Sequence, residues 1–465
     1  MSEDRQGLGE DRKQAAAAAL RDAFDGMIED LLAAREAIDS PALMPPPGDE
    51  RTLAEGYRYL LGFLHGSIER ALEDPLHPRF RRAIHPLNKS TIDNADAVYL
   101  RAGIDGTRSY RLRGRAAHCA HWRGGPRGSG RCAPQYVIFE LASGYAGDSG
   151  SLQELRPGTR INTSVLDSTA LEVDEDGCFE ILLAPQRPAD HRGNFMQTVR
   201  TSHGVTHVGC HLSCRQLFHD WEREDLLDLE ILMLGCEKEP ALPATVEGAR
   251  AMLTTVGELT RNPMHFWNAF YTVPLGSYGR VPGTIDTGSD ATFMPTNDVN
   301  APNALGIATA GGQSTNLYAG GLFRLGSGEV LLLEARVPLD PLFLGVHLSN
   351  LWGESLDVES HQSSLNAVQT RRDSDGVYRW VMSREDPGVA NWLDTTGLDH
   401  GFFTFRASYA RPPEEAQRPR LAARRLRLEE LGTALPPDTA RVTRADRERA
   451  ILMRHRHVQR RYRQY

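Results

Sequence analysis

The sequence predicts an α+β, β-rich fold with two antiparallel β-domains, of the sandwich or jelly-roll kind, between N-terminal and C-terminal helices. Three observations support this prediction. Apolar residues recur at three- and four-residue steps over the first 74 residues, as on one face of a helix. From residue 75 the period changes to two, in short runs separated by Gly, Asp and Pro. A second strand-rich run follows between residues 318 and 410.

These patterns divide the chain of 465 residues, which is long enough for two or three domains. The expected parts are an N-terminal helical segment (1–74), a first β-domain (75–224), a helical and glycine-rich connecting region (225–317), a second β-domain (318–410) and a basic helical tail (411–465).

Composition excludes several classes of protein. There is no run of 18 uninterrupted apolar residues, so we expect no membrane span. The N-terminus is charged with both signs and does not resemble a signal peptide, which predicts a cytoplasmic location. Six cysteines are too few for a disulfide scaffold in a chain of this length, so we expect reduced thiols.

Two helices are expected in the first part. One covers residues 11–38, and its apolar stripe is Leu20, Phe24, Met27, Ile28, Leu31 and Leu32. The run Pro45-Pro46-Pro47-Gly48 forms a stiff linker. Thr52 and Glu55 have the spacing of a capping box and predict the start of the second helix.

The first β-domain is predicted from short alternating or apolar runs. These are AVYLRAGI, SYRLRGRA, QYVIFELAS, FEILLAP and VTHVGCHLSCRQL. Residues 225–260 then return to a helical pattern, with LLDLEILML and AMLTTVGELT. The glycine-rich stretch 276–321 is too irregular for a phosphate loop, and no GxGxxG or GxxxxGK[ST] motif is present, so nucleotide binding is disfavoured.

The most specific local pattern lies at residues 352–397. Asp375-Gly376 separates SSLNAVQTRRD from VYRWVMS, which predicts a hairpin with the glycine at a positive φ. Asp386-Pro387-Gly388 ends the second strand, because proline cannot donate a ladder hydrogen bond.

The same region resembles a known family. EARVP, NLWGESLD, SSLN, DSDGVYRWVMSREDPGVANWLDTTG and GFFTFR resemble the C-terminal domain of bacterial proteins of domain-of-unknown-function family 1214. NKSTIDNADAVYLRAGIDGTRSYRLRG and CRQLFHDWERED are similar to the opening β-domain of those proteins. The resemblance implies a two-part, β-rich body with helical additions, and it supplies no catalytic residues.

Two polar groups are candidates for acid–base catalysis. Asp93, Asp96 and Tyr99 precede or begin a strand, where a buried carboxylate would have a raised pKa. The alternative is that they close an Asx-turn. His361, Asn366, Asp386 and Asn391 form the second group.

In the second group, His361 and Asp386 would form an acid–base pair, and Asn366 or Asn391 would stabilise an oxyanion. The candidate substrate-binding residues are Trp352, Trp392 and Arg406. The alternative is that Asp386 and Asn391 satisfy loop backbone groups while Trp392 fills the core.

No cofactor is favoured. The alternative is zinc or another transition metal, bound by His118, His203, His207, Cys210 and His211. If residues 205–217 form one strand, His207 and His211 lie roughly 13 Å apart, too far for one ion. The alternative to a metal site is structural histidines and buried thiols.

The tail 411–465 holds 15 Arg and 7 acidic residues, so it carries about +8 while the rest of the chain carries about −16. No nucleic-acid recognition motif accompanies this charge, so we expect no nucleic-acid partner. Thr443 and Asp446 predict the start of a helix that docks on its own body or on a neighbouring subunit, and we expect a homo-oligomer.

Three functional hypotheses follow. The first is a nucleotide-independent enzyme that acts on a small organic or lipid-like substrate by acid–base chemistry, as a lyase, isomerase or hydrolase, in a pocket between the β-domains. The second is a metalloenzyme that uses the His/Cys-rich loops. The third is a non-catalytic ligand-binding or assembly protein.

Overall fold

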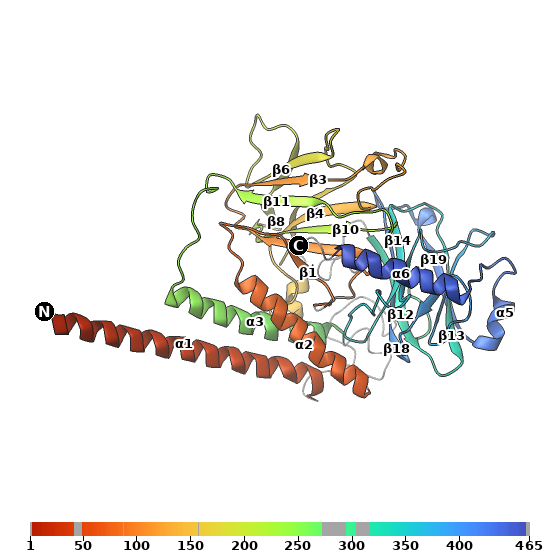
Figure 1. The fold of residues 1–465 in the computed structure, drawn as a ribbon, viewed down its shortest axis with the longest axis horizontal. Helices are drawn as coiled ribbons and strands as arrows, with labels where there is room; N and C mark the ends of the chain where they lie inside the picture. Colours follow the sequence, from red (N-terminus) through yellow and green to blue (C-terminus); the bar gives the residue numbers. More distant parts are fainter. Residues whose placement is uncertain are drawn as a thin grey trace.

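The computed structural model describes residues 2–40, 49–86, 88–156, 158–271, 294–303 and 316–461. Most of the glycine-rich stretch predicted at 276–321 lies outside these residues. The fold is α+β and β-rich, as the sequence predicts, and it consists of two β-sandwiches with helices beside them (Figure 1).

The first β-domain packs two sheets on one apolar core. The strand orders are β1-β2-β10-β4-β5 and β11-β3-β6-β7. The strands are β1 (Arg81–Ile84), β2 (Ala97–Gly103), β3 (Tyr110–Arg115), β4 (Tyr136–Ala142), β5 (Asn162–Asp167), β6 (Cys178–Ala184), β7 (Asn194–Gln197), β10 (His211–Leu217) and β11 (Asp228–Met233). A separate hairpin joins β8 (Val199–Ser202) to β9 (Val205–Val208).

The second β-domain is also a two-sheet sandwich around its own core. Its strand orders are β12-β18-β14-β15 and β17-β16-β13-β19. The strands are β12 (Asn316–Arg324), β13 (Glu329–Arg336), β14 (Phe343–Ser349), β15 (Ser364–Asn366), β16 (Tyr378–Ser383), β17 (Trp392–Asp394), β18 (His400–Ser408) and β19 (Arg420–Arg427).

The two β-domains repeat one topology. When β2–β7, β10 and β11 are matched in chain order with β12–β19, the order β2-β10-β4-β5 corresponds to β12-β18-β14-β15. The order β11-β3-β6-β7 corresponds in the same way to β19-β13-β16-β17. Each repeat even contains one parallel pair at the same place, β6–β7 and β16–β17. The body is therefore an internal duplication.

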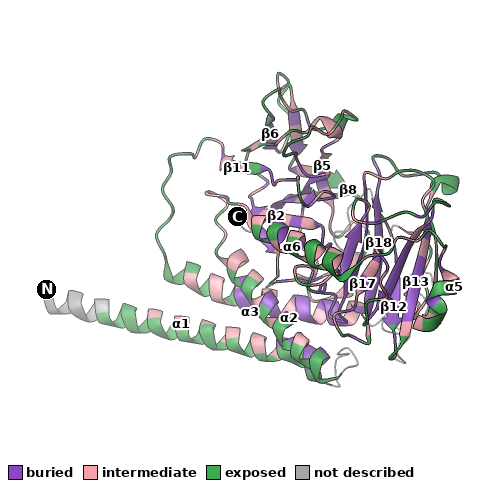
Figure 2. Cartoon of the chain, turned by 45° about the vertical axis from the view of Figure 1, so that its right-hand side comes forward, coloured by how far each residue is buried: buried purple, intermediate pink, exposed green. Residues whose placement is uncertain are grey.

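Three helices lie beside the sandwiches: α1 (Ser2–Asp39), α2 (Glu50–Ala71) and α3 (Val246–Tyr271). Figure 2 shows that the strands are largely buried, whereas α1 is exposed along much of its length. Helix α2 begins earlier than predicted, because the side chain of Asp49 accepts a hydrogen bond from the Thr52 amide (2.9 Å). None of the described helices combines the length and the apolar character that crossing a membrane requires.

The predicted helix over LLDLEILML is wrong. Residues 228–233 form β11, which pairs with β3 from Asp228↔Arg115 to Met233↔Tyr110. Alternate side chains, Ile231 and Met233, enter the first core, so the period of two decides the structure. The first β-domain thus extends past residue 224, and the helix of this region starts at Val246.

The predicted hairpin around Asp375-Gly376 is also wrong. Strand β15 pairs with β14 in one sheet, whereas β16 pairs with β13 and β17 in the other. The turn itself exists, and Gly376 has the expected positive φ of 77°. The connection from β15 to β16 crosses from one sheet of the sandwich to the other. Each strand pairs with a longer strand from elsewhere in the chain, β15 with β14 and β16 with β13.

The tail contains a strand that the prediction of a helical tail missed. Strand β19 pairs with β13 over its whole length, from Glu329↔Arg427 to Arg336↔Arg420. It is an edge strand with alternating exposed residues, and charged side chains on such an edge hinder pairing with other chains. The second β-domain therefore runs from β12 to β19.

After β19 come a short helix α5 (Leu431–Ala434) and the helix α6 (Arg444–Arg461). The predicted capping pattern is confirmed, since the Thr443 amide donates to Asp446 Oδ2 (2.7 Å) and the Asp446 amide donates to Thr443 Oγ1 (3.3 Å). Helix α6 docks on its own body: Arg454 donates to the Ser364 carbonyl of the second β-domain. Arg461 donates to the Ala95 carbonyl of the first (2.9 Å), so α6 fastens both domains to each other.

Candidate functional site

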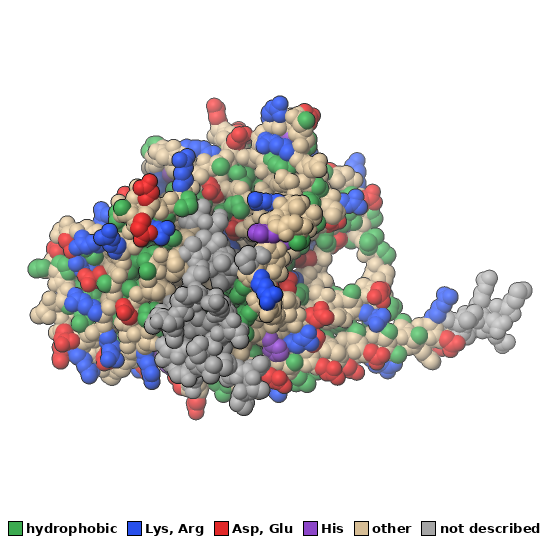
Figure 3. Space-filling view, turned by 180° about the vertical axis from the view of Figure 1, so that it is seen from behind, with side chains coloured by type: hydrophobic (Ala, Val, Ile, Leu, Met, Phe, Trp, Pro, Cys, Tyr) green, Lys and Arg blue, Asp and Glu red, His purple; other side chains and the backbone are tan. Residues whose placement is uncertain are grey.

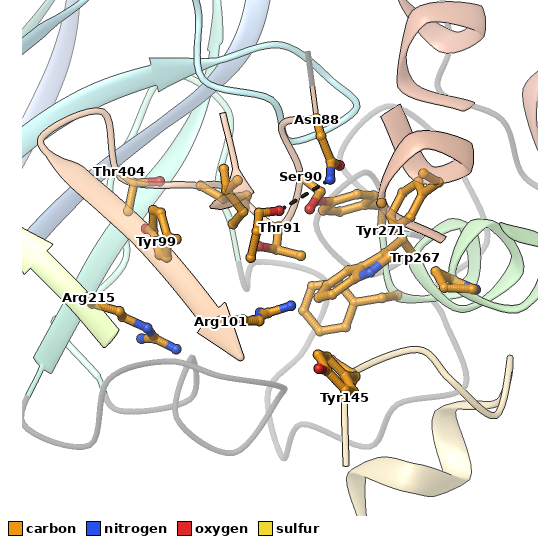
Figure 4. A pocket seen from close by; sticks show the side chains of 18 of the residues that line it. Asn88, Ser90, Thr91, Tyr99, Arg101, Tyr145, Arg215, Trp267, Tyr271 and Thr404 are labelled. Atoms are coloured by element: carbon orange, nitrogen blue, oxygen red, sulfur yellow. Dashed lines mark hydrogen bonds between the residues drawn. The ribbon is translucent and has the colours of Figure 1, made fainter. Parts of the chain in front are cut away.

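A cavity of about 240 Å³ lies between the two β-domains and helices α2 and α3. Its floor comes from corresponding strands of the repeats, β2 and β10 in the first and β12 and β18 in the second. We call it the ligand cavity. Its polar lining residues are Ser67, Arg70, Arg81, Asn88, Ser90, Thr91, Tyr99, Arg101, Tyr145, Arg215, Asn300, Asn303, Tyr318, Thr404 and Arg406 (Figure 4).

Each repeat contributes one Tyr–Arg pair to this cavity. Tyr99 on β2 lies directly opposite Arg215 on β10, with the guanidinium carbon 5.9 Å from the ring centroid. Tyr318 on β12 lies opposite Arg406 on β18 in the same way, at 5.4 Å. Arg406 also acts electrostatically on Tyr99, so the two pairs approach each other. The duplication therefore places two arginines and two tyrosines around one space.

Arg101 breaks the symmetry of the two repeats. It follows Tyr99 by two residues on β2, and the corresponding position on β12 is Gly320. In Figure 4 its guanidinium extends from β2 toward Trp267 and Tyr145. Burial and the neighbouring Arg81, Arg215 and Arg70 lower the pKa of Arg101 to about 10, although Tyr145 opposes this.

Most other arginines of the cavity have carboxylate partners. Arg70 makes a bidentate pair with Asp148 (2.8 and 2.9 Å). Arg81 pairs with Glu73 (2.6 Å), and Arg215 with Glu140 (3.4 Å). Within the described residues, neither Arg101 nor Arg406 makes an ion pair.

Arg406 is buried and bonded to neutral groups. It donates to the Ile92 carbonyl and lies 3.4 Å from His347 Nε2. Its Nε is buried with no hydrogen-bond partner among the described residues. Two guanidinium groups thus face the cavity with positive charge that no described carboxylate neutralises.

The opposite wall of the cavity is aromatic. Helix α3 supplies Trp267, Phe270 and Tyr271, and helix α2 supplies Phe63. These rings pack on one another, for example Trp267 on Phe270 with centroids 5.1 Å apart. The cavity therefore has an arginine-rich side, formed mainly by the strands with Arg70 of α2, and an apolar side formed by α3 and Phe63.

A buried His–Tyr stack supports the arginine-rich side. His211 on β10 stacks on Tyr145, with ring centroids 3.9 Å apart, and its Nδ1 is 3.5 Å from Cys210 Sγ. Burial and the nearby arginines hold the pKa of His211 well below its usual value. Burial raises the pKa of Cys210 to about 11, so both groups are neutral at pH 7.

Comparison with known proteins gives the fold and no activity. No protein-family model matches the chain, and no curated protein matches it. A crystal structure of an uncharacterized protein from Burkholderia cenocepacia is similar, with 25% identity, a TM-score of 0.69, and coverage of 90% of this chain and 100% of that one. The VPA0106 protein from Vibrio parahaemolyticus matches at 13% identity and a TM-score of 0.39, over 85% of this chain and 99% of that one.

Of the residues predicted from the sequence, Tyr99 and Arg406 lie in the ligand cavity. Tyr99 was a candidate catalytic residue and Arg406 a candidate for substrate binding. The hydroxyl of Tyr99 accepts a hydrogen bond from the Asn94 amide (2.8 Å). The sequence indicated these two residues from their local context. It did not indicate that they lie in corresponding strand pairs of the two repeats.

Asp96 and Asn366 do come together, in a structural cluster outside the cavity. Asn366 Nδ2 and Trp221 Nε1 both donate to Asp96 Oδ1, each at 2.8 Å. Burial raises the pKa of Asp96, and the nearby Arg454 and Arg461 oppose this rise. Asp96 is 2% exposed, and its contacts join residues of both β-domains.

Asp93 and His361 line a second, polar cavity of about 510 Å³. Asp93 accepts a hydrogen bond from the Ser355 amide (2.8 Å). The predicted His361–Asp386 pair is wrong, because His361 Nδ1 bonds Asp394 Oδ2 at 2.7 Å. Asp386 instead pairs with Arg447 of α6 (2.9 Å) and closes its own turn.

Three other candidates make contacts that support the fold. Asn391 Oδ1 accepts a hydrogen bond from the Arg371 amide, and Asn391 Nδ2 donates to the Arg371 carbonyl. This is the alternative that the sequence left open. Trp392 packs among apolar residues and donates to the Ser383 carbonyl (3.2 Å). Trp352 packs in the helical core and donates to the Thr52 carbonyl (2.7 Å).

The candidate metal ligands do not gather at one point. Residues 205–217 form two strands, β9 with His207 and β10 with His211, rather than one. His118 bonds the Pro126 carbonyl (3.1 Å), and His203 bonds Ser202 (3.0 Å). Across the described residues, no group of three potential ligands includes any of them.

Sequence reasoning missed Arg101, Arg215, Tyr318 and the aromatic wall. A signal was present, because Tyr99-x-Arg101 with Ser213-x-Arg215 has a counterpart in Tyr318-x-Gly320 with Thr404-x-Arg406. Each pattern is too short to stand out among 465 residues. The matched strand orders are needed to recognise it.

Proposed function

We propose that this protein binds a small organic carboxylate with an apolar body in the ligand cavity. The observation that carries the proposal is Arg101, a cavity-facing arginine without a carboxylate partner among the described residues. Arg101 is half-buried, and an unpaired charge with reduced access to water is costly. A ligand anion would compensate this charge. Guanidinium groups bind carboxylates through two parallel hydrogen bonds.

The rest of the lining supports the same ligand class. Of the lining residues that the structure describes, five are arginines and none is Asp, Glu, His, Cys or Lys. The facing wall of Trp267, Phe270 and Phe63 offers apolar surface for the body of the ligand. A concave, largely apolar space with a few convergent polar groups is typical of small-molecule sites.

Binding is favoured over acid–base catalysis. A general acid or base must lie within hydrogen-bond reach of the substrate, and the only titratable acids in the described lining are tyrosines. Burial raises the pKa of Tyr145 to about 12, which leaves it protonated at pH 7.

Membership of family 1214 stays part of the proposal and rests on the DPG-x-x-NWLDT-x-G string.

Matched ligands test the proposal by isothermal titration calorimetry. Octanoate and 2-naphthoate would be compared with the neutral octanol and 2-naphthalenemethanol and with octylamine. We expect one carboxylate per chain. A hydrogen bond to a charged group contributes about 1.5–3 kcal/mol, so the alcohols should bind at least about tenfold more weakly. Equal affinity of acid and alcohol, or no binding of either carboxylate, would contradict the proposal.

A further inference from the structure

A separate cluster of ligand-type side chains lies on α2 and just after β1. His65 and Glu69 are one helical turn apart, and His85 follows β1. One ligand atom from each lies within 4.8 Å of the other two. The sequence did not indicate this group, because His85 is distant from the helix in the chain and reaches it only when β1 packs beside α2.

The distances approach those of a metal site. His65 Nδ1 is 3.8 Å from Glu69 Oε2, and the rings of His65 and His85 meet edge to face with centroids 5.2 Å apart. A zinc ion about 2.1 Å from each ligand holds the ligands roughly 3.0–3.5 Å apart. The His65 side chain is 45% exposed, so it can rotate to close the remaining distance.

The charges around the cluster are compatible with a cation. Arg81 lies 3.5 Å from Glu69 Oε2, but its closer partner is Glu73, at 2.6 Å. Glu69 Oε2 is buried and accepts no hydrogen bond from the described residues.

We propose that His65, Glu69 and His85 bind one divalent transition-metal ion, and that zinc suits this donor set best. Two imidazoles and one carboxylate are the ligand set of several zinc enzymes, in which a water or the substrate takes the fourth position. These three residues do not line the ligand cavity, although Arg81, which does, lies beside Glu69. It is also distinct from the metal ligands that the sequence predicted.

Zinc binding by untagged, chelator-washed protein tests the proposal. Zinc chloride is titrated calorimetrically, and the bound metal is counted by plasma mass spectrometry after gel filtration. The wild type should retain a zinc equivalent that His65→Ala and His85→Ala lose, with affinity reduced at least about tenfold. His65 is exposed, so its variant should keep the fold, which the melting temperature without zinc verifies.

His203→Ala is the matched control, because His203 is an exposed histidine outside the cluster. It should bind zinc like the wild type, and zinc should raise the melting temperature of both by mass action. The proposal is overturned if the wild type binds no zinc. It is equally overturned if His65→Ala keeps full affinity, or if His203→Ala loses it.

Discussion

Arg101→Met should abolish carboxylate binding and at the same time raise the melting temperature. Burial and neighbouring arginines hold the pKa of Arg101 at about 10, so the folded state disfavours its charged form. This unfavourable contribution is present at pH 7, where the side chain is protonated, and methionine removes it while keeping apolar bulk. We expect a gain of about 1–3 kcal/mol, seen as a rise of roughly 2 °C or more.

Arg215→Met is the matched control, with the same chemical change at another arginine of the cavity. Arg215 pairs with Glu140, whose side chain is 3% exposed. Its loss leaves that carboxylate buried without its cation, at a cost of about 3–5 kcal/mol. Scanning calorimetry should therefore give shifts of opposite sign. A lower melting temperature for Arg101→Met with binding retained would remove Arg101 from the site.

Asp96→Ala should destabilise the protein severely. The substitution leaves Trp221 Nε1 and Asn366 Nδ2 without their acceptor, and the buried Arg454 and Arg461 lose a negative charge. We expect a loss of about 3–5 kcal/mol in the free energy of unfolding. Urea unfolding measures it directly.

Asp105→Ala is the control for that experiment. Asp105 closes an exposed turn by accepting from Thr107, and its loss should stay within about 1 kcal/mol. If Asp96→Ala is as mild as Asp105→Ala, the cluster does not fasten the domains. Asp96 would then be available again as a catalytic candidate.

Local patterns were sufficient for the fold class and insufficient for the pairing of strands. The period of two predicted most strands, yet residues 226–234, of which five are leucines, were assigned to a helix. Strand β19 was not predicted, because its many arginines do not resemble a strand pattern. Arginines suit an edge strand, but the edge position becomes evident only from the pairing with β13. Partners distant in the chain decide both cases.

The sequence predicted residues of the ligand cavity only where a single residue could be recognised without its spatial neighbours. Tyr99 and Arg406 were singled out, but the sequence could not show that they meet, because 307 residues separate them. Asp96 and Asn366 were assigned to catalysis because both are polar and close to strands. Both are buried in one hydrogen-bonded cluster between the β-domains, and burial of this kind depends on the tertiary fold.

The crystal structure of the complex with 8-bromooctanoate tests the central claim most directly, since anomalous scattering locates the bromine. We expect the carboxylate within about 3 Å of the Arg101 guanidinium. We expect the bromine beside Trp267 and Phe270, on the apolar wall. Figure 3 shows charges of both signs interspersed on one face of the molecule. A carboxylate that lies outside the ligand cavity, or inside it without contact to Arg101, would contradict the proposed binding site.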